Sequence, residues 1–378
     1  MNPAHRPHSR AAHARSLIAA IAAVYSLFGC ARSAAPPAEP QSAAQSEAAI
    51  DKASLALTAA GPWPAGDQVG MANTLGAGTW MRCAQYLNAE GAKSYELSYE
   101  TSNDMNQSPF GVKLEYRYRP TVGIPGTRHA FNGEEIVTGE PGAQATQLDA
   151  LGHFGFLDEA WDGKGALPAD KVRYYGGYTQ ADVKPTPGSP LLKLGVEHIP
   201  PIVTSAVLLD ARAALGNGEI LAPGRAITRA DIDTMLQAQG LAERGLLPGD
   251  VLYIYTGWGE NWTSPDYYTK GPGLAYDAAQ YIAEKKIVLI ALDNPFTDPV
   301  NDGQLAGKAG PAEGTPPGLP FAIHHTDLTQ SGIHQIQNAK LDELARDKVW
   351  LSCTMILPLR SAGGAGSPVR PVAIGAAR

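Results

Sequence analysis

The spacing of apolar residues predicts two kinds of strand in this chain. Residues 94–100 and 112–118 alternate apolar and polar side chains, which is typical of strands with one buried face. Four later stretches are almost uniformly apolar, which predicts strands buried on both faces. These stretches are 206–209, 251–255, 287–292 and 349–357.

Helical spacing occurs between the apolar strands, at 229–239, 273–285 and 341–348. Thr228 followed by Asp231 predicts an N-terminal cap for the first of these helices. Strands that alternate with helices indicate an α/β fold, and the early alternating strands add an antiparallel or mixed part to the sheet. We find no internal repeat and no linker after residue 60, so we expect 61–378 to form a single domain.

The N-terminus reads as a secretory signal of the lipoprotein type. Residues 1–29 contain three arginines and no acidic residue, and an apolar run over 17–28 leads to Cys30. We expect Cys30 to be lipidated and 30–60, rich in Ala, Pro and Ser, to be a flexible tether. An ordinary signal peptide cut further on and an uncleaved anchor are the alternatives. This interpretation places the protein in a bacterial cell envelope, facing the periplasm.

Charge and composition exclude several partners. The formal net charge is −7, which argues against nucleic acid as a partner. No apolar run reaches the roughly 20 residues of a membrane-spanning helix, so membrane contact would come only through the lipid anchor. The glycines at 363–366 are followed by Pro368 and Pro371 rather than by a helix, so no nucleotide cofactor is expected. Cys83 and Cys353 are either a disulfide or two buried thiols.

Candidate chemistry lies in 143–153. If its first half is a strand, Gln147 and Asp149 point to the same side. A helical turn after Asp149 would bring His153 back beside the carboxylate, and Gly152 permits close backbone contact. An imidazole oriented by a carboxylate is a recurring general base. A strand end with only a local hydrogen bond is the alternative.

Several segments resemble one known family. They are 66–73, 195–204, 248–251 and 366–371, and together they span nearly all of 61–378. The chain resembles the cyclase family of metal-dependent hydrolases, which includes kynurenine formamidase (arylformamidase) and isatin hydrolase. The resemblance implies a swivelling β/β/α cyclase-like fold with a mixed sheet and flanking helices, commonly oligomeric, and hence a homo-oligomer. It also implies hydrolysis of a small aryl or cyclic amide, a small-molecule substrate, with one or two divalent cations, Zn or Mn.

The family's metal motif is altered here. His-x-Gly-Thr-His-x-Asp-x-Pro-x-His falls on a stretch in which Ala143 and Gln147 replace the two ligand histidines. Asp149 and His153 are kept.

Further on, a ligand histidine twelve residues before a ligand glutamate falls on His325 and Gln337. The implied metal site, Asp149, His325, Gln147 and Gln337, is therefore weak or absent. His324 or His129 could substitute for a missing ligand.

Two functions follow from these residues. The first is an amide hydrolase of the arylformamidase type, in which His153 activates water and Asp149 orients His153 or binds a metal. The second is a non-catalytic small-molecule-binding envelope lipoprotein that kept the fold and lost the metal site.

Overall fold

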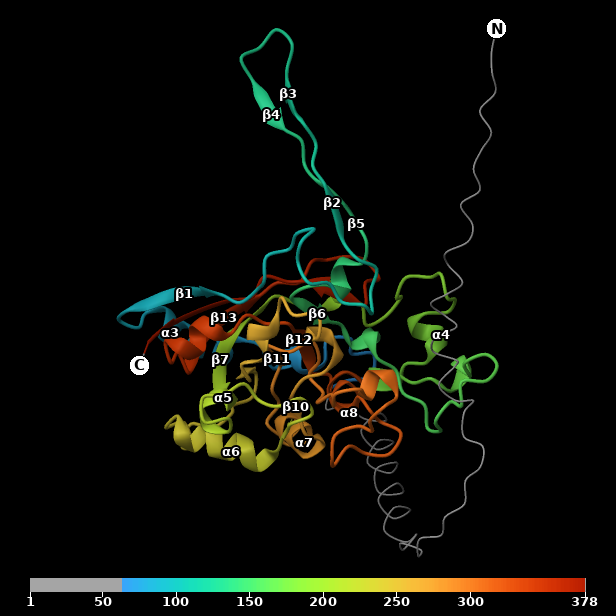
Figure 1. Cartoon of the computed structure of the whole chain (residues 1–378), viewed down its shortest axis with the longest axis vertical. Helices are drawn as coiled ribbons and strands as arrows, with labels where there is room; N and C mark the ends of the chain where they lie inside the picture. Colours follow the sequence, from blue (N-terminus) through green and yellow to red (C-terminus); the bar gives the residue numbers. More distant parts are fainter. Residues whose placement is uncertain (1–62, 378) are drawn as a thin grey trace, which may run out of the picture.

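The computed structural model describes residues 63–377 and is built around one mixed sheet (Figure 1). Its strands are β1 (Ala92–Glu96), β6 (Gln147–Asp149), β7 (Ile202–Asp210), β9 (Val251–Tyr255), β11 (Leu289–Leu292), β12 (His334–Gln337), β13 (Leu351–Ile356), β14 (Gly366–Pro368) and β15 (Val372–Ala376). They are ordered β1-β15-β13-β7-β9-β11-β12-β6-β14. The four central strands β7, β9, β11 and β12 are parallel, and the outer pairings are antiparallel. The predicted α/β class with a mixed sheet in a single domain is confirmed.

Helices cover the sheet because its central strands are apolar on both faces. The helices are α3 (Ala77–Leu87), α4 (Gln180–Val183), α5 (Ala211–Ala214), α6 (Arg229–Ala238), α7 (Tyr276–Glu284), α8 (Ala322–His324) and α9 (Asp342–Arg346). Along β7, Val207 and Leu209 pack in one core with side chains of α6 and α7. Ala206 and Leu208 pack in a second core on the opposite face. The sheet is therefore buried on both sides, as the apolar strands predict.

The predicted strand at 112–118 has a different environment from the one expected. β2 (Glu115–Arg117) pairs with β5 (Ile136–Thr138), and β3 (Thr121–Gly123) pairs with β4 (Ala130–Asn132). The two ribbons form an arm that projects away from the sheet (Figure 1). Their side chains are almost all exposed, so the expectation of a half-buried strand is wrong here.

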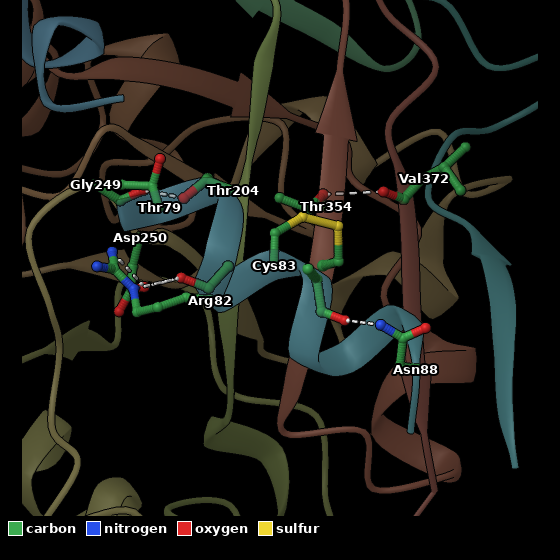
Figure 2. The surroundings of a disulfide bond; sticks show 12 residues. Thr79, Arg82, Cys83, Asn88, Thr204, Gly249, Asp250, Thr354 and Val372 are labelled. Carbon is green, nitrogen blue, oxygen red and sulfur yellow. Dashed lines mark hydrogen bonds and ion pairs between the residues drawn. A yellow bond between two sulfur atoms is a disulfide. The ribbon is translucent and has the colours of Figure 1, made fainter. Parts of the chain in front are cut away.

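A disulfide joins Cys83 of α3 to Cys353 of β13 across 270 residues of sequence (Figure 2). Both cysteines are buried. Beside them, Arg82 Nε donates a hydrogen bond to Ser205 Oγ of β7 at 3.2 Å, which fixes α3 against the sheet. Of the two alternatives for these cysteines, the structure has the disulfide.

Two remaining predictions concern the ends of the chain and the membrane. The signal, Cys30 and the tether lie outside the described residues. Within 63–377, no helix combines the length and apolarity that crossing a bilayer requires.

The helix cap is as predicted, because the Thr228 side chain accepts a hydrogen bond from the backbone amide of Asp231 and α6 begins at Arg229. Two short strands, β8 (Ala226–Ile227) and β10 (Gly273–Leu274), form a separate parallel pair.

Candidate active site

The candidate site is built on the antiparallel pair β6 and β12. In this register Asp149 lies opposite Gln335, and Gln147 lies opposite Gln337. Side chains two apart on a strand share a face, and directly opposed residues share it too. The pairing therefore gathers one carboxylate and three amides on one face, which confirms that Gln147 and Asp149 point to the same side.

Asp149 is held by Gln337 and His324 rather than by His153. Its side chain is 1% exposed. Gln337 Nε2 donates to Asp149 Oδ2 at 2.6 Å and lies 3.4 Å from His324 Nε2. His324 Nε2 is itself 3.8 Å from Asp149 Oδ2. Three side chains from β6, β12 and α8 therefore meet at one point.

His324 is oriented by a second buried carboxylate, Asp298. The distance from His324 Nδ1 to Asp298 Oδ2 is 2.5 Å, and because a carboxylate only accepts, Nδ1 carries the hydrogen. The backbone amide of Ile323 donates to Asp298 Oδ1 at 2.6 Å. Burial lowers the pKa of His324, but the hydrogen bond and charge of Asp298, helped by Asp149, outweigh burial and raise it. The ring is thus fixed with Nε2 facing Asp149 and Gln337.

Behind this group lies a buried π-helix, His325–Ser331, which continues directly from α8. Its Asp327 accepts a hydrogen bond from Gln335 Nε2 at 2.9 Å. Burial raises the pKa of Asp327 to about 8, although the Gln335 hydrogen bond opposes the shift. Asp327 is therefore mostly protonated at neutral pH. π-Helical turns often occur at functional sites.

Two oxygens of the group formed by Asp149, Gln337 and His324 lack a hydrogen-bond partner among the described residues: Asp149 Oδ1 and Gln337 Oε1. Both are buried. Buried polar atoms are nearly always hydrogen-bonded in native proteins, so such atoms indicate where water or a ligand binds. These two accept hydrogen bonds, which makes the site suited to a group that donates them.

Aromatic rings and His153 surround the exposed edge of this cluster. The rings of Phe154 and Phe321 lie 5.4 Å and 6.0 Å from the His324 ring, centroid to centroid. His153 is exposed, and its ring centroid is 6.5 Å from that of His324. The chain does turn after Asp149, in a single 3₁₀ turn at Leu151–His153, with Gly152 close against Leu194. That turn brings His153 beside His324.

The other sequence-predicted histidines lie elsewhere. The structure places His324, not His325, against Asp149 and Gln337. Adjacent residues on a helix point about 100° apart, and His325 instead packs on Phe156 with ring centroids 4.5 Å apart. Burial lowers the pKa of His325 to about 4, so it is neutral. His129 is on the exposed arm.

The residues present do not fit the divalent cation that the family resemblance implies. Ala143 has no ligand atom, and Gln337 turns its amide N–H toward Asp149, so it donates where a metal ligand would accept. No group of three or more His, Cys, Asp or Glu suited to a metal occurs within 63–377. Gln147 is half-buried and contributes at most a neutral oxygen.

Sequence reasoning missed Asp298, and it considered His324 only as a substitute ligand. Asp298 follows β11 in an irregular loop, where no periodic pattern distinguishes a site residue from a turn residue. The feature that could have identified Asp298 is its position after a strand of the parallel part of the sheet. Side chains just beyond the carboxyl ends of parallel strands are favoured as binding residues in α/β sheets.

The chain resembles known proteins in sequence. The sequence model of the putative cyclase family matches residues 95–299, more than half of the chain. Kynurenine formamidase of Bacillus thuringiensis (strain Al Hakam) is 35% identical over 101 residues, which are 27% of this chain and 39% of that protein. The enzyme of Bacillus anthracis is 34% identical over the same length. The chain thus spans about two fifths of the length of these curated relatives.

A solved structure agrees with the fold. A crystal structure described as a novel cyclase aligns with a TM-score of 0.67 and 24% identity, over 85% of this chain and 98% of that chain. The cyclase-like α/β fold expected from the resemblance is therefore confirmed. By its sequence match over more than half its length, this chain belongs to the putative cyclase family.

Proposed function

We propose that the protein hydrolyses a small aryl or cyclic amide, with His153 as the general base. The observation that carries the proposal is the buried group of Asp149, Gln337 and His324, which has unsatisfied acceptor oxygens and adjoins an exposed imidazole. The partial match to kynurenine formamidases supports the same reaction class.

Each residue has a distinct role in this proposal. Asp298 fixes His324, and His324 together with Gln337 fixes Asp149. The free Oδ1 of Asp149 accepts a hydrogen bond from the attacking water and orients it. His153, exposed at the edge of the cluster, exchanges protons readily with solvent.

The reaction balances without a further reactant. Water gives one proton to His153 while its oxygen bonds to the carbonyl carbon. The C–N bond then breaks, and the departing nitrogen takes the proton back from His153. The products are a carboxylic acid, formate in the case of a formamide, and an amine.

The aromatic surroundings support an aryl substrate. Phe154 and Phe321 flank His324, and Phe296 extends the row, 5.9 Å from Phe321 between ring centroids. Half-buried rings of this kind offer edge-to-face or stacked contacts to an aromatic group. An aryl group would lie along these rings while its amide reaches Asp149.

The proposal is tested by assaying the purified full-length chain on a panel of aryl formamides, cyclic amides and lactones. His153→Ala should lower turnover by roughly a hundredfold or more, the usual contribution of a positioned base. Asp149→Asn should also be severe without unfolding the protein. His129→Ala is the matched control, because it removes an exposed imidazole on the arm.

The alternative, a non-catalytic binding lipoprotein, is favoured by the replacements at Ala143, Gln147 and Gln337. It expects no turnover on the whole panel, while a small aromatic ligand still raises the melting temperature. That result, or full activity of His153→Ala, would overturn the hydrolase proposal.

A further inference from the structure

The amide of Gln337 occupies the centre of the buried cluster. Its Nε2 is 2.6 Å from Asp149 Oδ2 and 3.4 Å from His324 Nε2, so one NH₂ group faces two acceptors. The position is the one at which the family resemblance places a glutamate ligand. We propose that Gln337 takes the place of the divalent cation: its amide hydrogens hold Asp149 and His324 together, and the site assembles without a metal.

Each buried carboxylate of the cluster has a hydrogen-bond donor from the chain itself. Asp298 accepts hydrogen bonds from His324 Nδ1 at 2.5 Å and from the Ile323 amide at 2.6 Å, and Asp327 accepts one from Gln335 Nε2 at 2.9 Å. Asp149 is then the remaining buried carboxylate of this group. A buried carboxylate needs hydrogen bonds, and Gln337 Nε2 donates one to Asp149 Oδ2 at 2.6 Å.

Binding a cation would break the contacts of the Gln337 amide with Asp149 and His324. To offer Oε1 to a metal beside Asp149, the Gln337 amide must rotate and withdraw its hydrogens from both acceptors. Only one carboxylate, Asp149, would then face the ion. Neutral amide oxygens and a single carboxylate make a weak site for Zn²⁺ or Mn²⁺.

This inference concerns how the site is held together, so it stands whether or not the proposed hydrolysis is correct. Its test uses metal content and melting temperature rather than turnover. The wild-type full-length chain should contain well under one Zn or Mn per molecule after purification. Its melting temperature should not change with a chelator, MnCl₂ or ZnCl₂, whereas a cation at a hundred times its Kd would raise it by several degrees.

The decisive variant is Gln337→Glu, which places a second carboxylate against Asp149. It should melt several degrees lower than the wild type in chelator, and MnCl₂ or ZnCl₂ should restore the loss, because the variant now needs a cation. Gln237→Glu makes the same charge change on the exposed side of α6 and should respond to neither treatment.

A second variant covers the case in which Gln337→Glu fails to fold. Gln337→Met removes the amide at similar volume, so it should lose stability and gain nothing from added metal. A stoichiometric metal that survives dialysis of the wild type against a chelator would overturn the inference. So would a metal-induced rise in the wild-type melting temperature, or wild-type stability of Gln337→Met.

Discussion

Asp298→Asn tests whether Asp298 acts by positioning His324 rather than by contacting the substrate. The carboxylate accepts hydrogen bonds from His324 Nδ1 at 2.5 Å and from the Ile323 amide at 2.6 Å, one on each oxygen. Asparagine keeps the shape but has one accepting oxygen, so one donor loses its partner. If the new NH₂ faces His324, the ring proton moves to Nε2, which can then no longer accept from Gln337.

The expected magnitude follows from these contacts. A hydrogen bond to a charged group contributes about 1.5–3 kcal/mol to stability, so the free energy of unfolding should fall by about that amount. A small displacement of a catalytic group can cost roughly a hundredfold in rate, so kcat should fall by about that factor. KM should change little, because Asp298 is 1% exposed and does not face the substrate.

Denaturant unfolding and steady-state kinetics on an aryl formamide measure both effects. Asp302→Asn is the matched control, since Asp302 is exposed and pairs with Lys270 at the surface. The control should match the wild type in both assays. Wild-type kcat in Asp298→Asn would refute the chain of contacts from Asp298 through His324 to Asp149.

Three further predictions concern other parts of the molecule. Burial raises the pKa of Asp293 to about 6, partly offset by hydrogen bonds from Thr256, so its ionised form is disfavoured in the folded state. The stability that the wild type has relative to Asp293→Asn should therefore fall by roughly 3 kcal/mol in denaturant melts as pH rises from about 4 to about 6, and then level off. Cys353→Ser breaks the bond to Cys83 and should lower the free energy of unfolding by about 2–5 kcal/mol, as should reduction of the wild type with dithiothreitol. Cys30→Ser should release the protein from the membrane fraction or block its processing, and a full-length wild type found wholly in the cytoplasm would contradict the lipoprotein interpretation.

Sequence reasoning worked where one local rule determines the outcome. Residues 251–255 are all apolar, and they form β9 with those same bounds. Thr228 and Asp231 predict a cap, and the cap is present. Alternation along β6 placed Gln147 and Asp149 on one side, because strand geometry alone requires it.

Sequence reasoning failed where contacts between distant parts of the chain determine the structure. Alternation at 112–118 is the same for a strand on a core and for a strand in a projecting arm, so burial could not be inferred. Spacing from Gln337 selected His325, whereas His324 faces Asp149, because the facing residue depends on how α8 and the π-helix rotate against β12. The partner of Asp149 is set by the antiparallel register of β6 with β12, across 188 residues of sequence.

We propose that this member of the cyclase family has a hydrolytic site held together by Gln337 rather than by a metal. The most direct measurement is turnover of an aryl formamide by the wild-type chain, before and after exhaustive dialysis against a chelator, and again with MnCl₂ or ZnCl₂ added. We predict the same rate in all conditions. Activity that disappears on chelation and returns with the added cation would contradict the claim.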